Sequence, residues 1–199
     1  MAFVTVVASV MSLMASNGGG IDLSYRGFSG GMMLHAGYAD CGNINIGGVS
    51  QRMSGMPTGI GGALKVRFGD HLRVGTEGYV SSLSYGDYGS SVSVGWGGLL
   101  VDFVWQVGKI APYVGATIGG GSVENLTLTR YPATDMLPEL NTSYRNYGVG
   151  VVVPFVGAEY ALTERMSLTV KADYMIPFGT SEPDFPSGVR CYVGFMFNH

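Results

Sequence analysis

Apolar and polar residues alternate strictly along residues 166–176, and this period of two limits the structures that the chain can form. One set of alternate positions is apolar and the other is mostly polar: Met166, Leu168, Val170, Ala172, Tyr174 and Ile176 against Ser167, Thr169, Lys171, Asp173 and Met175. Successive side chains of a β-strand point to opposite faces, so this segment is predicted to be a strand with one apolar face. Residues 60–68, 72–80 and 189–197 alternate in the same way. The chain is therefore predicted to be all-β.

Four further segments are less regular strand candidates: residues 28–38, 91–105, 113–123 and 147–160. The alternation along residues 91–105 changes phase near Gly97 and Gly98, where a β-bulge would turn the side chains over. Residues 147–160 are a valine-rich run whose facing the pattern does not fix. With the four regular segments, these candidates make eight strands.

Charged residues make up only 13% of the chain, whereas hydrophobic residues make up 46%. A soluble domain usually carries about 25% charged residues, so this chain has too few to cover a soluble surface. The sequence also lacks the uninterrupted apolar run of about 18 residues that a transmembrane helix needs. In lipid, the remaining way to satisfy every backbone hydrogen bond is a closed barrel. The predicted fold is a closed antiparallel up-and-down transmembrane β-barrel of about eight strands.

Short and long connections alternate between these segments. The joins at 69–70, 106–109 and 163–165 are tight, and those at 39–58, 84–90, 124–146 and 177–187 are long and rich in Gly, Pro, Asn and Ser. Short periplasmic turns and long external loops are typical of barrels in the outer membrane of Gram-negative bacteria. Aromatic residues near the strand ends indicate interfacial girdles: Phe68, Phe103, Trp105, Tyr160, Phe195 and Phe197 on the turn side, Tyr38 and Tyr174 on the loop side.

The N-terminal segment is expected to lie outside the barrel. Residues 1–16 are apolar and end in small residues, as a secretory signal peptide does, but they lack the basic start and are interpreted as a signal-peptide remnant. Residues 17–24 are expected to be an N-terminal extension and residues 25–199 the barrel domain. Cys41 falls in a predicted loop and Cys191 on the apolar face of the last strand. The alternation places the two on opposite faces, which argues against a disulfide between them.

The polar faces of the predicted strands carry charges of both signs. They are Lys65, Arg67, Arg73, Glu77, Asp102, Glu159, Lys171, Asp173 and Arg190. An eight-stranded barrel has an interior only just filled by side chains, so charges inside it must pair. The near-balance of sign predicts a packed lumen held by a charge network. A narrow ion or proton path is the alternative interpretation.

Candidates for catalysis are few. The histidines are His35, His71 and His199; the last two have no obvious partner, and only His35 is predicted to face the lumen. A lipid-acting enzyme built on His35 would need a site at the rim or on the outside of the barrel. No spacing of Cys or His indicates a zinc site, no cofactor is expected, and the net charge of −3 argues against nucleic-acid binding. The glycine runs at 59–62 and 119–121 are interpreted as strand glycines.

The terminal strand, residues 189–197, ends on an aromatic residue as the C-terminal assembly signal of outer-membrane barrels does, although Asn198 and His199 follow it. On this pattern the chain resembles the small eight-stranded outer-membrane barrels of the OmpX and OmpA-domain type, particularly those of the Bacteroidetes type. The resemblance implies insertion by the barrel-assembly machinery and contact with outer-membrane lipid.

The leading functional hypothesis is a monomeric structural or surface-interaction protein that presents four external loops to an extracellular or envelope protein partner. A small-solute channel is the second hypothesis and a lipid-modifying enzyme the third. A soluble lipocalin-like barrel with inverted facing is an outside alternative, disfavoured by the low charge content.

Overall fold

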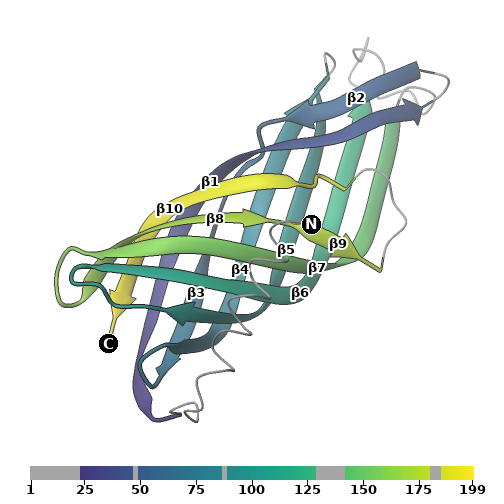
Figure 1. Ribbon diagram of the computed structural model, residues 1–199. Helices are drawn as coiled ribbons and strands as arrows, with labels where there is room; N and C mark the ends of the chain where they lie inside the picture. The colour runs from purple at the N-terminus through teal and green to yellow at the C-terminus, as the bar shows by residue number, and fades with distance from the viewer. Residues whose placement is uncertain (1–22, 47–48, 87–88, 129–141, 180–184) are drawn as a thin grey trace.

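The first and last long strands pair with each other and close the sheet into a ring (Figure 1). This computed structural model describes residues 23–46, 49–86, 89–128, 142–179 and 185–199. Its strands are β1 (Tyr25–Ile46), β2 (Val49–Gly55), β3 (Thr58–Phe68), β4 (Leu72–Tyr85), β5 (Ser90–Val104), β6 (Ile110–Leu128), β7 (Thr142–Ala161), β8 (Met166–Tyr174), β9 (Ile176–Phe178) and β10 (Gly188–Asn198). The ring runs β1–β3–β4–β5–β6–β7–β8–β10 and back to β1, all antiparallel, which confirms the predicted eight-stranded barrel.

No helix in the described part of the chain is long and apolar enough to cross a membrane. The signal-peptide prediction for residues 1–16 and most of the extension at 17–24 lie outside the described residues.

The three short joins lie where the sequence predicts them, but the long joins are shorter than predicted because the strands run further. The segment at 39–58, predicted to be a loop, is mostly a β-hairpin in which the end of β1 pairs with β2. Its polar, glycine-containing sequence hides the alternation that would reveal a strand. Similarly, β6 continues to Leu128 and β7 begins at Thr142.

Strand β9 continues the line of β8. Asp173 of β8 pairs with Phe155, and Ile176 of β9 pairs with Val152, so both strands keep one register along β7. At the interruption, Tyr174 stands opposite Pro154. Proline has no N–H to donate, which explains why the ladder stops and restarts at this point.

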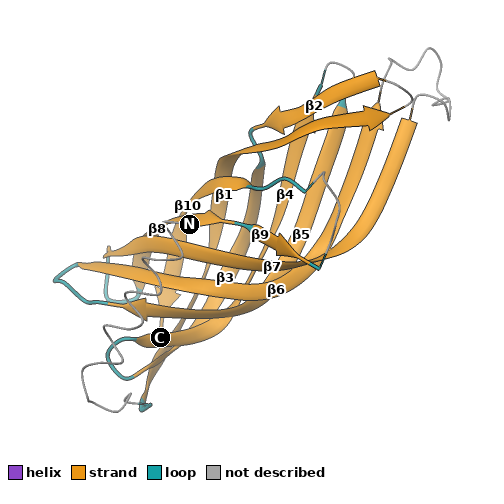
Figure 2. Cartoon of the chain, turned by 45° about the vertical axis from the view of Figure 1, so that its right-hand side comes forward, coloured by secondary structure: helices purple, strands orange, loops and turns teal. Residues whose placement is uncertain are grey.

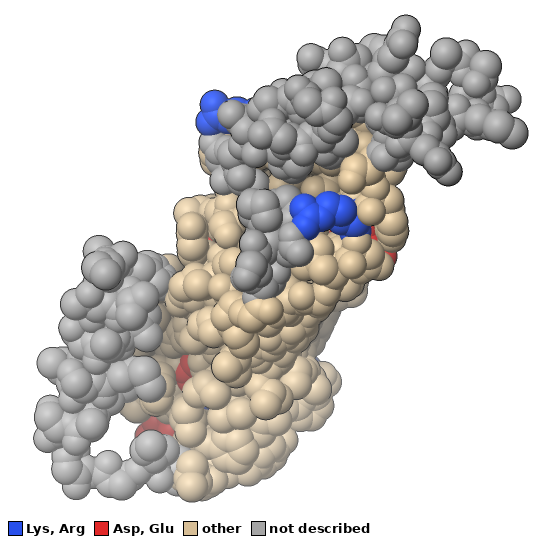
Figure 3. All heavy atoms as spheres, turned by 90° about the vertical axis from the view of Figure 1, so that its right-hand side faces the viewer, with Lys and Arg blue, Asp and Glu red and all other residues tan. Residues whose placement is uncertain are grey.

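The outer face of the barrel is an apolar belt. Exposed side chains on it include Met32, Leu34, Ile60, Leu64, Val80, Leu99, Ile118, Val170 and Val193. Tyr38 and Tyr174 are exposed at one edge of the belt, where both pair with Val189, and Tyr160, Phe195 and Phe197 are exposed toward the turns. Most of the described surface in Figure 3 belongs to uncharged residues, with Lys or Arg atoms gathered in its upper half. The belt is the surface that contact with lipid tails requires.

At the loop end, several strands run on well beyond the others (Figure 2). In this added length the two faces exchange character. Crossing a bilayer takes about 9–11 residues of a tilted strand, whereas β6 has 19 residues and β7 has 20. In the added length the outer face is mostly polar, with exposed Ser82, Glu124 and Asn146, although Tyr144 is exposed there as well. The inner face there is buried and mostly apolar, with Leu83, Tyr85, Val92, Val94 and Val123, although Asn125 and Thr127 are also buried in it. We call this part, residues 39–46, 49–55, 81–85, 90–94, 123–128 and 142–147, the projection.

The predicted bulge near Gly97 and Gly98 is wrong. Strand β5 keeps one register with β4 and with β6 along its whole length, and its even-numbered residues stay inside throughout. Val94 and Asp102 both face the interior of the barrel, but the first is apolar and the second is charged. The inward-facing residues of β5 thus change from apolar to charged while the direction of the side chains stays the same. The same holds for β7, whose odd-numbered residues Val149 to Glu159 point inward.

Candidate functional site

Four charged side chains form a closed cluster near the turn end of the lumen. Lys65 of β3, Arg73 of β4, Asp102 of β5 and Glu159 of β7 are all at least nine-tenths buried. Arg73 donates from Nε to Asp102 Oδ1 at 2.6 Å and from Nη1 to Glu159 Oε1 at 2.7 Å. Lys65 Nζ lies 3.0 Å from Asp102 Oδ2 and 3.7 Å from Glu159 Oε1. Two cations and two carboxylates thus neutralise one another; we call them the turn-side quartet.

A second cluster of equal composition lies further along the lumen, and we call it the mid-lumen quartet. Lys171 Nζ lies 2.8 Å from Glu77 Oε2 and 3.7 Å from Asp173 Oδ2, and Arg190 Nε lies 2.8 Å from Asp173 Oδ1. Thr117 Oγ1 donates to the other oxygen of Glu77 at 2.6 Å. Strands β4, β8 and β10 supply these charges, so the network ties distant parts of the ring together.

Aromatic rings fill the space around the quartets. Lys65 Nζ lies 4.4 Å and Arg73 Cζ 4.9 Å from the ring centroid of Tyr113, and Lys171 Nζ lies 5.0 Å from that of Phe155. The ring of Tyr113 lies where a side chain on Gly157 would stand, so this strand glycine creates its room. The cations are therefore held by carboxylates and by ring faces together.

Arg67, the ninth predicted lumen charge, belongs to neither quartet. It faces inward on β3 but lies at the turn end, only partly buried, where Nη2 donates to the backbone oxygen of Asp70 at 2.6 Å. The other eight predicted residues are the eight members of the quartets.

On the loop side of the mid-lumen quartet lies an aromatic layer around His35. The ring of His35 lies 4.9 Å from that of Tyr192 and 5.8 Å from that of Tyr79, and Tyr79 lies 5.5 Å from Trp96. His35 Nε2 lies 3.0 Å from Ser81 Oγ. Ser81 was not identified from the sequence, because a single serine in a serine-rich strand carries no distinguishing pattern.

This Ser–His pair does not meet the requirements of a lipid-acting site. His35 is only 5% exposed and lies inside the barrel, away from the rim and the outer face. Its Nδ1 atom finds no hydrogen-bond partner among the described residues, so no described carboxylate orients the ring.

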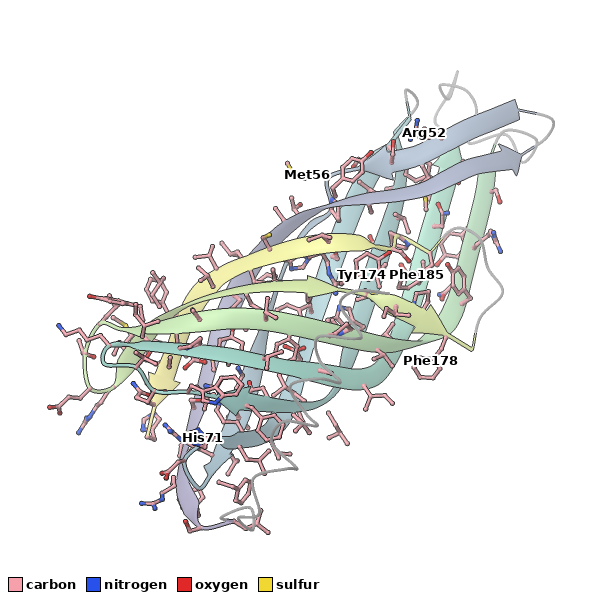
Figure 4. All side chains as sticks on the ribbon, in the orientation of Figure 1. Arg52, Met56, His71, Tyr174, Phe178 and Phe185 are labelled. Carbon is pink, nitrogen blue, oxygen red and sulfur yellow. The ribbon has the colours of Figure 1, made fainter. Side chains whose placement is uncertain are left out.

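The projection closes the lumen at the loop end with apolar packing. Met53 of β2 and Phe185, which precedes β10, are buried in one cluster with Leu83, Val92, Val94, Val123 and Val151. Phe185 lies within the barrel outline in Figure 4, whereas Phe178 of β9 is exposed on the outside. Tyr85 bonds to Asn125 Oδ1 and Thr127 Oγ1, both at 2.6 Å, and so satisfies the polar groups in this apolar interior.

The remaining histidines both have partners, contrary to the sequence prediction. His71 Nδ1 lies 3.0 Å from the backbone oxygen of Val104. His199 stacks on Phe28 with ring centroids 4.9 Å apart, and its backbone pairs with that of Phe28. Asn198 and His199 therefore extend the closing strand pair beyond Phe197. Cys191 is an exposed free thiol on the outer face.

No family model matches the chain, and no curated protein sequence matches it. Several solved protein structures, however, match the fold of this chain. The outer membrane protein OprG of Pseudomonas aeruginosa is 14% identical with a TM-score of 0.56, over 90% of this chain and 99% of that one. Ail, the attachment invasion locus protein of Yersinia pestis, is 10% identical with a TM-score of 0.55, over 87% and 99% of the two chains. Neisserial surface protein A is 12% identical with a TM-score of 0.55, over 88% and 97%.

At such identities the likeness concerns the fold. The closed eight-stranded ring and the apolar belt are those of a small bacterial outer-membrane β-barrel.

Proposed function

We propose that the protein is a closed outer-membrane barrel that works at the cell surface through its projection. The observation that carries this proposal is the inversion of facing at the loop end, where the outside is polar and the inside is apolar. A purely membrane-spanning barrel has no need of this extra length. A polar outer wall on a packed interior is what a rigid surface for a protein partner requires.

The lining of the lumen supports a closed barrel. A permeating ion would have to break quartets in which every cation is already paired, and then cross the apolar interior of the projection. Apolar constrictions obstruct ions because water leaves them. The small-solute channel is therefore the less supported alternative, and the position of His35 weighs against a lipid-modifying enzyme.

Two of the similar structures support a surface role by analogy. Ail is described as an attachment invasion locus protein in complex with a heparin analogue, sucrose octasulfate, and the Neisserial protein as a surface protein. The expected partners remain outer-membrane lipid, the barrel-assembly machinery and an extracellular or envelope protein, with the barrel itself monomeric. The finer likeness to OmpX-type, OmpA-domain and Bacteroidetes-type barrels stays a prediction.

Planar-bilayer recording tests the closed lumen. The folded protein is expected to give no stable conductance steps, whereas steady single-channel steps would favour the channel. Photocrosslinking on intact cells tests the surface role, with the reactive group placed at Ser82 in the projection or at Ile118 in the belt as the matched control. Protein adducts are expected from position 82 only; adducts from neither position would contradict a protein partner at this wall.

A further inference from the structure

A cavity of about 260 Å³ opens at the turn end of the lumen, at the opposite end from the projection. Its floor includes Arg73 and Glu159 of the turn-side quartet. Its rim includes Arg26, Arg67 and Lys109, which come from three separate parts of the chain. His71, labelled in Figure 4, marks this end of the barrel. The cavity is therefore reached from the compartment that the short turns face.

The lining of this cavity is basic, although the chain as a whole is acidic. Four Lys or Arg side chains line it against the side-chain carboxylates of Glu159 and Glu164 and the terminal carboxylate of His199, so the lining keeps one net positive charge, whereas the whole chain has a net charge of −3. Glu159 is already engaged by Arg73 and Lys65. Arg67 donates to a backbone oxygen and Lys109 is exposed, so their charge is available to a ligand.

Neutral hydrogen-bonding groups complete the lining. Ser29 and Ser167 are buried in the wall, and Gln106, Thr163 and Asn198 also line the cavity. Asn198 Nδ2 donates to Ser167 Oγ at 3.0 Å, which leaves the hydroxyl hydrogen of Ser167 free to point elsewhere. Converging cations and hydroxyl or amide donors are the groups that bind oxyanions.

We propose that this cavity binds a small oxyanion, a phosphate or carboxylate group, presented from the turn side of the membrane. Arg67 and Lys109 supply the charge, and the side-chain hydroxyl and amide groups fix its orientation. A volume of about 260 Å³ is below the usual range for drug-sized ligands, so it fits a single phosphate or a short carboxylate-bearing group. The phosphate could come from a soluble molecule or from a lipid headgroup at the rim.

The two tryptophans allow a direct test by ¹⁵N NMR of their indole groups. Trp105 immediately precedes Gln106 in the cavity wall, whereas Trp96 is buried in the aromatic layer and serves as an internal control. Inorganic phosphate is titrated at constant ionic strength into the full chain in maltoside micelles, with chloride as the balancing anion. The Trp105 signal is expected to shift saturably while the Trp96 signal stays in place.

Variants decide whether the shift reports the cavity. The double variant Arg67→Gln with Lys109→Gln is expected to weaken phosphate binding at least tenfold, whereas Arg52→Gln, on the exposed hairpin at the other end, leaves it unchanged. In nanodiscs containing phosphatidylglycerol, a Trp105 signal already at the bound position without added phosphate would identify the lipid headgroup as the source. A linear shift that the double variant does not alter would overturn the proposal.

Discussion

Glu77 shows how much a single lumen charge contributes to stability. It is buried and accepts hydrogen bonds from Lys171 and Thr117, which lie on β8 and β6. Replacement Glu77→Ala leaves Lys171 with only the more distant Asp173, so it is expected to destabilise the barrel by about 3–5 kcal/mol. The loss is measured as a lower midpoint of urea or thermal unfolding.

Two companion variants separate charge from packing. Glu124→Ala removes an exposed carboxylate and is expected to change stability by at most about 0.5 kcal/mol. The double variant Glu77→Ala with Lys171→Met removes both charges and is expected to regain part of the loss. Unfolding of Glu77→Ala at the same midpoint as the parent would contradict a paired lumen.

Glycines on the inner wall are a second residue-scale determinant. A Cβ at Gly61 would collide with the backbone oxygen of Gly78 and with the ring of Tyr79. A Cβ at Gly95, which is on the outer face of β5 and serves as the control, would meet nothing within 4 Å. Gly61→Ala is therefore expected to cost about 1–3 kcal/mol, and Gly95→Ala to be neutral. Equal unfolding midpoints for the two variants would show that Tyr79 has room to move.

The balanced signs of the lumen charges could be inferred from the sequence, but the pairing could not. Alternation indicates which side chains point inward, and this was enough to select six of the eight quartet members. Asp102 and Glu159 were included although the pattern left the facing of their segments open. Their partners depend on the register and tilt of the whole ring: Arg73 meets Glu159 across 86 positions of sequence. No local sequence pattern shows which residues far apart in the chain will pair. For the same reason Arg67 was grouped with the quartet residues, although its guanidinium group pairs with none of them.

At the scale of elements, the inversion of facing makes a prediction about accessibility. In a background with Cys41 and Cys191 replaced by serine, Ser82→Cys is expected to react with a membrane-impermeant maleimide. Ile118→Cys, on the belt, is expected to be protected, because lipid covers that face. The ratio of labelling rates in liposomes measures the difference. Equal rates would show that the belt does not lie in lipid.

The strands within the membrane were predictable because lipid outside and charges inside produce a regular alternation. In the membrane the apolar residues face outward, and in the projection they face inward. A prediction that assumes apolar residues always face outward explains this change as a β-bulge, which is why one was predicted near Gly97 and Gly98. The β1–β2 hairpin was missed for a related reason. Its residues carry too little apolar contrast to show any alternation.

For the whole molecule, ring closure predicts resistance to detergent. An unheated sample is expected to migrate faster on an SDS gel than a boiled one, because the closed hydrogen-bonded sheet stays compact until it is heated. Equal mobility, together with recovery in the soluble fraction, would contradict a membrane barrel.

The pairing of β1 with β10 also determines when the molecule can fold. Ser29 meets Asn198, so the seam joins the two ends of the barrel sequence and cannot form until the last strand has been made. A chain that stops before Gly188 would leave β1 and β8 with open edges, and every unpaired backbone group in lipid costs several kcal/mol. The whole chain must therefore be synthesised before the barrel can close in the membrane. A quality-control factor could then distinguish complete from truncated chains by the presence of the last strand alone.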